Sequence, residues 1–153
     1  MGKGPGFYMK IDSKDIEKLG VRLRSTLDTA VDGAKDPMTQ HARFVMGRAS
    51  FRTPLWTGAL MDSAFTEQPK VEQVGGDEAL RIRFGYASPE TDRINPETGK
   101  KVSEYVIEVH EEPWAERDTG TPWFLQVPFE ELAERYFTTL RQGVKDAFRY
   151  LRR

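Results

Sequence analysis

The segment 54–63 is the feature that most constrains how this chain can fold, because it separates a helical pattern from a strand pattern. Pro54 ends a helix, since its ring fixes φ and its nitrogen carries no proton to donate. Gly58 lies shortly after it and permits a backbone conformation that other residues rarely adopt. The hydroxyls of Thr57 and Ser63 can bond neighbouring backbone groups and hold a turn. We therefore predict a helical first third, then a sharp turn, then strands.

The first third has the pattern of an amphipathic helix. Ser13 is a suitable N-cap, and apolar residues follow at the spacing of one helix face, namely Ile16, Leu19, Leu23, Leu27, Ala30, Val31 and Ala34. Glycine weakens a helix, so the pattern allows a break near Gly20. Asp36 and Pro37 have the pattern of an N-cap and a first-turn proline that open another helix. We therefore expect helix over about 14–52 in two or three pieces.

The stretch 37–52 carries two apolar sides. Phe44 and Phe51 project almost opposite to the side formed by Met38, Ala42, Val45, Met46 and Ala49. One sheet cannot cover both sides. The second side therefore packs on the first or last helix, which is the commoner outcome, or it contacts another subunit.

Two segments beyond the turn alternate like strands. Lys70–Val74 and the stretch 80–86 flank a Gly-Gly-Asp turn signal, which predicts a β-hairpin. The polar stretch 88–101 is long for a loop in a compact domain, so we expect it to reach a partner or to be disordered. The β-branched residues in 105–109 predict a third strand.

The last part of the chain predicts a strongly amphipathic helix. Its apolar arc is formed by Phe129, Leu132, Ala133, Tyr136, Phe137, Leu140, Val144, Ala147, Phe148 and Leu151. The polar face carries Arg135, Arg141, Lys145, Arg149, Arg152 and Arg153. Such a face is most often solvated, and its functional alternative is a contact with an acidic subunit or with passing DNA.

Together these elements predict an α+β fold, in which an antiparallel sheet of three or more strands packs against a long N-terminal helical region and a C-terminal helix. Residues 1–12 are expected to form a flexible N-terminal arm. Residues 13–153 are expected to form a single α+β domain, since this length suits one core.

The composition argues against several kinds of binding partner and excludes cysteine chemistry. The 153 residues hold 23 Lys and Arg against 24 Asp and Glu, a net charge of -1, so no overall field favours nucleic acid or an anionic membrane. The sequence has no Cys, which excludes disulfides, thiolate nucleophiles and cysteine-based zinc sites. No segment approaches the roughly 18 apolar residues of a membrane span, and we expect no membrane contact.

No motif for catalysis or metal binding stands out. His41 and His110 belong to different halves of the chain, and the adjacent Glu111 and Glu112 would point to opposite faces of a strand. Ser63 lacks the context of a nucleophile elbow, and the chain has no glycine-rich phosphate loop. We therefore expect no catalytic residue, no metal, no cofactor and a protein that is not an enzyme.

Three short patterns accompany the long helical region. The first is Pro-x-x-Thr-Gly-x-Leu-x-x-Ser, the second a Tyr-Ala pair at a strand end, and the third a tyrosine segment followed by a glycine loop and the last helix. The matching residues are Pro54, Thr57, Gly58, Leu60 and Ser63, then Tyr86 and Ala87, then Tyr105 with His110 or Glu111, Gly120, Thr121 and Phe124. Over about 14–150 the chain resembles the head-tail joining, or tail-completion (neck), proteins of tailed bacteriophages. The stretches 88–101 and 111–122 are longer than the family's usual connections.

This resemblance implies a structural virion protein at the phage neck, assembled in the host cytoplasm. It implies a homo-oligomeric ring, commonly of six copies, between the head connector or adaptor and the tail-tube or tail-terminator proteins. Candidate subunit contacts are Phe44, Phe51, Trp114 and Trp123. Alternatives are a minor capsid or tail-terminator protein and, from another class, a small hydrolase or a carbohydrate-binding module that uses the two Trp residues and the acidic loop.

Overall fold

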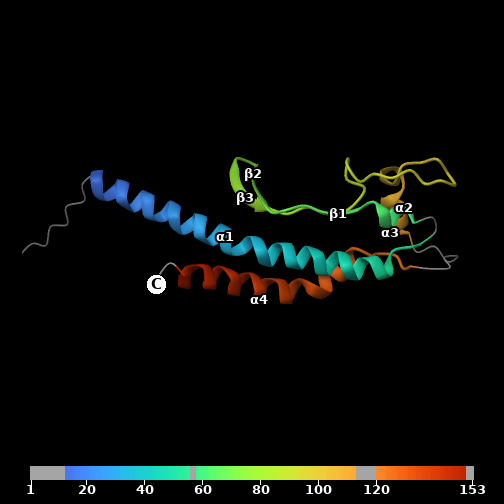
Figure 1. The fold of residues 1–153 in the computed structure, drawn as a ribbon. Helices are drawn as coiled ribbons and strands as arrows, with labels where there is room; N and C mark the ends of the chain where they lie inside the picture. Colours follow the sequence, from blue (N-terminus) through green and yellow to red (C-terminus); the bar gives the residue numbers. More distant parts are fainter. Residues whose placement is uncertain (1–12, 56–57, 113–119, 151–153) are drawn as a thin grey trace, which may run out of the picture.

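Two long antiparallel helices run side by side along the molecule, as Figure 1 shows. They are α1 (Ser13–Arg52) and α4 (Gln126–Tyr150) in a computed structural model that describes residues 13–55, 58–112 and 120–150. The elements between them are α2 (Ala59–Asp62), β1 (Ala64–Thr66), β2 (Lys70–Val74), β3 (Asp77–Arg81), β4 (Phe84–Tyr86), the 3₁₀ turn η1 (Val102–Glu104) and α3 (Val106–Glu111). The expected arm at 1–12 lies outside the described residues.

The first helix is continuous, so the expected break near Gly20 and the expected new start at Pro37 are both wrong. Pro37 has no N–H to donate to the carbonyl of Gly33, one turn earlier. Instead, Gly143 of α4 lies against that carbonyl, since a Cβ added to Gly143 would be 2.5 Å from the oxygen. Packing on α4 therefore maintains the helix where local preference would end it.

Contacts between α1 and α4 continue along the pair. The ring of His41 stacks on Tyr136 with centroids 4.4 Å apart. Glu131 of α4 accepts from Arg48 at 3.1 Å and from Arg52 at 3.0 Å. Aromatic stacking and ion pairing thus join the second half of α1 to the first half of α4.

The strands form one long hairpin whose ladder is interrupted. Pairs from Lys70↔Arg81 to Val74↔Asp77 make the outer sheet, and pairs from Ala64↔Tyr86 to Thr66↔Phe84 make the inner one. Between the two sheets, one side has three residues and the other has two, and the longer side ends at Pro69. A proline cannot donate to the ladder, so the pairing breaks there.

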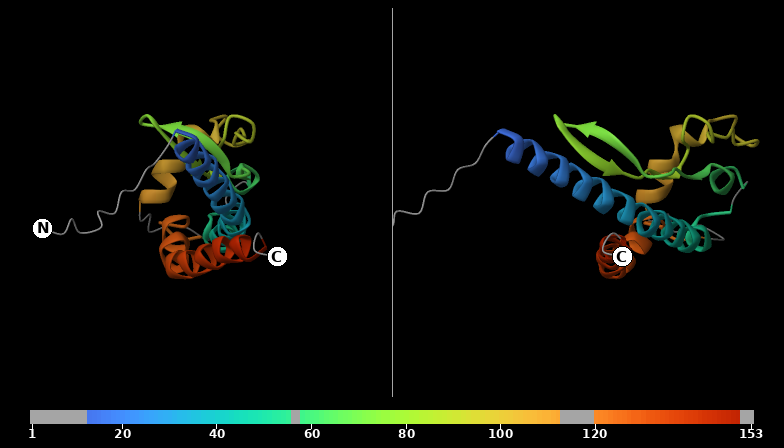
Figure 2. Two further views of the ribbon diagram at one scale, coloured as in Figure 1. Left: turned by 90° about the vertical axis from the view of Figure 1, so that its left-hand side faces the viewer. Right: turned by 60° about the vertical axis from the view of Figure 1, so that its left-hand side comes forward.

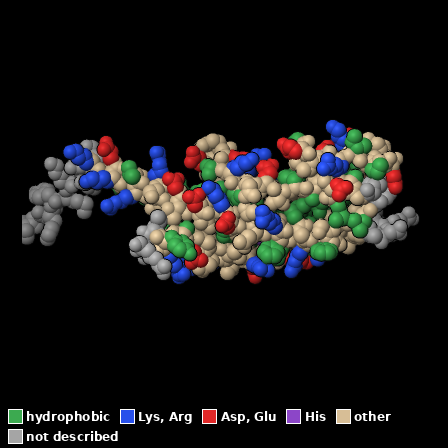
Figure 3. Space-filling model, in the orientation of Figure 1, with side chains coloured by type: hydrophobic (Ala, Val, Ile, Leu, Met, Phe, Trp, Pro, Cys, Tyr) green, Lys and Arg blue, Asp and Glu red, His purple; other side chains and the backbone are tan. Residues whose placement is uncertain are grey.

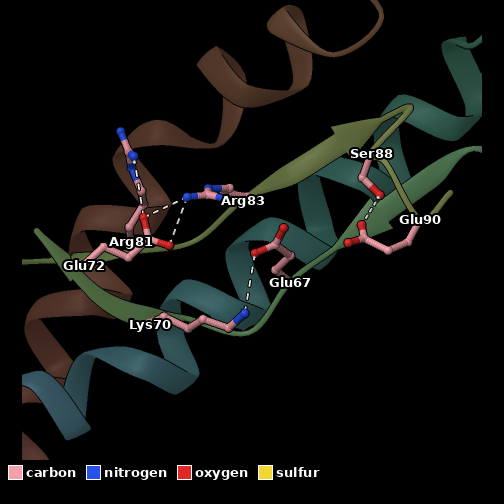
Figure 4. A network of polar contacts seen from close by, with 7 residues as sticks. All are labelled: Glu67, Lys70, Glu72, Arg81, Arg83, Ser88 and Glu90. Atoms are coloured by element: carbon pink, nitrogen blue, oxygen red, sulfur yellow. Dashed lines mark hydrogen bonds and ion pairs between the residues drawn. The ribbon is translucent and has the colours of Figure 1, made fainter. Parts of the chain in front are cut away.

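The predicted hairpin is confirmed, although 80–86 is divided between β3 and β4. Gly75 and Gly76 form its tip with φ of 62° and 97°, as a tight two-residue turn requires. Figure 4 shows the polar contacts beside the interruption, where one terminal nitrogen of Arg83 donates to both carboxylate oxygens of Glu72, at 3.0 and 2.9 Å. Arg81 lies 3.6 Å from the same carboxylate.

The predicted third strand at 105–109 is wrong, because this stretch belongs largely to helix α3. In the helix, Val109 is buried in the core while Ile107 is 67% exposed. A strand would have placed both on one face. Tertiary packing therefore overrides the strand preference of the β-branched residues.

The stretch 88–101 folds on itself. Asn95 is buried, and its side-chain oxygen accepts from the backbone of Glu97 at 2.9 Å and of Thr98 at 3.3 Å. Asp92 accepts from the backbone N–H and the hydroxyl of Ser103, which lowers the pKa of the Asp92 carboxyl. This loop is thus held to η1 by its own polar side chains.

The α+β class is confirmed, but the sheet differs from the one expected. In the described residues the strands form two sheets of two strands each. One core cluster is formed by Ala59 and Leu60 of α2, Val102 of η1, Val109 of α3 and Phe124, which lies just before α4. Further buried apolar residues lie on α1 and α4, namely Met38, Ala42, Val45, Ala49 and Leu132.

Candidate functional site

The residues of the family-like patterns come together at the end of α1. Leu60 is in the core, and the Tyr86 ring meets Phe124 edge to face with centroids 5.4 Å apart. Gly58 has φ of 76° and begins α2 in a left-handed conformation. Thr57 lies outside the described residues. The patterns, which span more than sixty residues of sequence, therefore meet in one packed junction.

Hydroxyl groups hold this junction to the backbone. Thr53 donates to the carbonyl of Ala49 at 2.8 Å and lies 2.7 Å from the hydroxyl of Tyr86. Burial raises the pKa of Tyr86, and the hydrogen bond to Thr53 opposes that rise. Ser63 donates to the carbonyl of Leu60 at 2.6 Å. Both Thr53 and Ser63 are buried, so these bonds satisfy groups that water cannot reach.

The carbonyl of Ser63 links the inner sheet to the loop beyond it. It accepts from the N–H of Ala87 at 3.0 Å and from the hydroxyl of Thr91 at 2.8 Å. Ala87 has φ of 59°, which is uncommon for a residue with a side chain. The Tyr-Ala pair therefore marks the point where the chain leaves β4 and turns into the loop.

The glycine loop packs on the proline of the first pattern. A Cβ on Gly120 would lie 2.6 Å from the nitrogen of Pro54, and Thr121 donates to the carbonyl of Arg52 at 2.8 Å. Only a glycine with φ of 83° fits this approach. The loop and the end of α1 are consequently fixed together.

The third pattern surrounds the same core. Tyr105 is partly buried, and burial raises its pKa while a hydrogen bond to Asn95 opposes the rise. His110 meets Phe124 edge to face with centroids 4.9 Å apart, and its carbonyl accepts from the N–H of Trp123 at 2.7 Å. These contacts pack the third pattern against the same folded unit as the other two patterns.

The candidate subunit contacts lie in different places. Phe51 is 91% exposed, and Phe44 is half exposed beneath the guanidinium of Arg135, which is 4.8 Å from the ring centroid. Packing within the chain therefore accounts for much of Phe44 and for none of Phe51. Trp123 is exposed and meets His110 edge to face. Trp114 lies outside the described residues.

The first part of α1 is an apolar surface whose exposure the sequence did not predict. In Figures 1 and 2, α1 continues well beyond the end of α4. Every described side chain from residue 14 to 28 is exposed, including the apolar Ile16, Leu19, Leu23 and Leu27. Their helical spacing was visible in the sequence, but only the structure shows that nothing in the described chain covers them.

A second such feature is a groove between α3 and the inner sheet, of about 340 Å³. Phe65, Phe84, Ile107, His110, Glu111 and Leu125 line it. The sequence could not predict this groove, because it depends on 105–109 being a helix.

The described residues contain no group of three or more His, Asp or Glu side chains placed to hold a metal. Burial lowers the pKa of His41 and of His110, and the nearby Glu111 opposes the effect at His110. The buried Nε2 of His41 has no hydrogen-bond partner among the residues that the structure describes. The His41 ring packs on Tyr136, and the His110 ring packs on Phe124 and accepts from the backbone N–H of Gln126 at 3.4 Å.

The basic face of the last helix is partly engaged within the chain. Arg149 lies 3.2 Å from Asp146, and Arg135 covers Phe44. Arg152 and Arg153 lie outside the described residues. The exposed surface in Figure 3 mixes basic and acidic side chains over the helix pair.

No family model, curated protein or solved structure matches this chain. Among the helices that the structure describes, none combines the length and apolar character that crossing a bilayer requires.

Proposed function

We propose that this protein is a structural component of a tailed-phage virion that forms a ring at the neck and joins the head connector to the tail. The observation that carries the proposal is the convergence of Leu60, Ser63, Tyr86, Gly120 and Phe124 on one junction. The residues on which the sequence resemblance rests are therefore neighbours in the folded protein. This convergence supports a shared fold with the neck proteins.

Exposed apolar side chains support an assembly role. Phe51, Ile107 and the first part of α1 leave large apolar groups in water. The four apolar side chains of the first part of α1 share one helix face, and an exposed apolar face of this kind is typical of protein contacts. A ring uses two different patches on each copy, each meeting the other patch on the next copy.

The proposal is tested by the state of the purified protein and by the phage itself. Electron microscopy and light scattering should reveal closed rings, formed alone or on the connector. A phage with this gene removed should accumulate filled heads and unjoined tails, and added protein should restore joining. Restoration of head or tail formation instead would favour the minor capsid or tail-terminator alternative.

The exposed phenylalanines provide a sharper variant. Phe44→Ser combined with Phe51→Ser should leave a folded monomer and abolish rings, whereas Arg43→Ser on the same helix should leave rings intact. Unchanged oligomers in the double variant would remove these residues from the interface. A stable monomer whose melting temperature rises saturably with an oligosaccharide would favour the carbohydrate-binding alternative.

A further inference from the structure

The first part of α1 has an apolar side that no described part of the chain covers. Residues 14–28, here called the α1 extension, precede the region of α1 that α4 covers, since Ala147 and Tyr150 at the end of α4 lie near Gly33 and Asp32. This segment extends a helix that already packs on α4, so it needs no nucleus of its own, although Gly20 weakens it. Packing by a partner would therefore stabilise it further.

The α1 extension presents one apolar stripe. Ile16, Leu19, Leu23 and Leu27 follow at spacings of three and four residues and are 57–61% exposed. This spacing places them on one face, over a length of roughly 16 Å. An apolar groove on a partner binds an amphipathic helix through a row of apolar side chains at this spacing.

The groove between α3 and the inner sheet, here called the α3 groove, is the matching surface on the same chain. Its lining is mostly apolar and includes Phe65, Phe84 and Ile107, and Ile107 has most of its surface in water. A helix stripe laid there would cover Ile107 as well as its own leucines. The contact would therefore remove exposed apolar side chains of both surfaces from water.

Charge distinguishes a second copy from other occupants. The α1 extension carries Lys14, Lys18, Arg22 and Arg24 against Asp15, Glu17 and Asp28, a net charge of 4 − 3 = +1. Basic side chains predominate on this projecting end in Figure 3. Glu111 lines the groove, and the stretch 102–112 around it also carries Glu104, Glu108 and Glu112 with no Lys or Arg. A basic helix therefore meets an acidic stretch, which steers and orients the contact.

We propose that the α1 extension of one copy docks in the α3 groove of the next copy. The contact joins two different patches, so it repeats from copy to copy and closes a ring when the rotation allows. This docking proposal depends on the proposed neck function only for the number of copies in the ring and for the position of the ring in the virion. Leu19 and Leu23 lie at the centre of the docked stripe.

Disulfide trapping tests the pairing directly, because the chain has no cysteine of its own. A Leu23→Cys chain and an Ile107→Cys chain, mixed and mildly oxidised, should yield a cross-linked dimer containing one of each. Cross-linking of the Leu23→Cys chain with itself would show that two extensions pair with each other and would overturn the proposal. Absence of any cross-link between folded chains would overturn it as well.

Solution association provides the second measurement. Leu19→Gln or Leu23→Gln should weaken self-association by at least about tenfold each, because a buried leucine becomes polar. The matched control is Val21→Gln, since Val21 is 70% exposed on the opposite side of the same helix and should have no effect. Ile107→Gln should weaken association like the leucine variants.

The two proposals fail separately. If Leu19→Gln and Leu23→Gln assemble as readily as the parent chain, the docking proposal is overturned while a ring at the neck can still stand. If the extension and groove cross-link but the protein restores no head-tail joining, the docking stands and the neck function falls.

Discussion

Gly143 of α4 packs against the carbonyl oxygen of Gly33 in α1, so closely that an added Cβ would lie 2.5 Å from it. That carbonyl has no helical donor because the residue one turn later is Pro37. Two glycines thus allow a proline to remain inside a forty-residue helix. The same contact explains why α1 and α4 approach closely at this point.

Gly33→Ala should therefore destabilise the protein. Its Cβ would lie 2.7 Å from the Cβ of Ala147, and relieving such an overlap costs about 1–3 kcal/mol. Gly47→Ala is the control, because nothing lies within 4 Å of its added Cβ and alanine favours the helix by up to about 1 kcal/mol. Denaturant unfolding should show opposite signs for the two variants. Stabilisation by both would contradict the close crossing.

Gly120→Ala should disrupt the junction between the glycine loop and the end of α1. Its Cβ would meet the backbone of Pro54, which cannot move aside like a flexible side chain. Gly99→Ala is the control, since Gly99 also has positive φ but has open space around it. The strained backbone conformation alone should lower the unfolding free energy of the Gly99→Ala control by about 1–2 kcal/mol. We expect a larger decrease in stability for Gly120→Ala, and equal decreases in thermal unfolding would argue against this packing.

The bond between Thr53 and Tyr86 should contribute a measurable coupling. Tyr86→Phe should lower the free energy of unfolding by about 0.5–1.5 kcal/mol, because it removes one buried hydrogen bond. Thr53→Val also removes the bond to Ala49, so its own effect is larger. A double-mutant cycle isolates the pair, and coupling close to zero would mean that the two hydroxyls do not interact.

Stability should fall in mild acid because of His41. Burial lowers the pKa of His41 below 6.5, so between the two pKa values the unfolded chain binds a proton that the folded protein does not. The stability that His41 contributes by staying neutral is fully present above about pH 6.5 and is lost as the pH falls toward the pKa of His41 in the folded protein. His110 shifts in the same direction, and Asp92 titrates well below this range.

His41→Phe tests this expectation, since phenylalanine retains a ring against Tyr136 and removes the unpartnered Nε2. Unfolding free energies measured at about pH 7.5 and about pH 5.5 should differ less in the variant than in the parent chain. The residual difference reports on His110. An identical pH difference in both proteins would show that His41 is not the group responsible.

Local rules in the sequence correctly predicted several elements. The pair Gly75-Gly76 specifies a tight hairpin because each residue needs positive φ, and the hairpin forms there. The strong apolar arc in the last helix identified α4, and Pro54 correctly placed the end of α1. These features depend on residues close together in the chain, so the sequence alone was sufficient for them.

Tertiary structure decided the rest. Pro37 stays inside α1 because α4 packs on it, and residues 105–109 become largely helical because the core accepts Val109 and leaves Ile107 outside. The exposure of the α1 extension follows from where α4 ends relative to α1, which no periodicity encodes. Amphipathic spacing shows that a helix face is apolar, whereas only the three-dimensional packing determines whether the same chain covers that face.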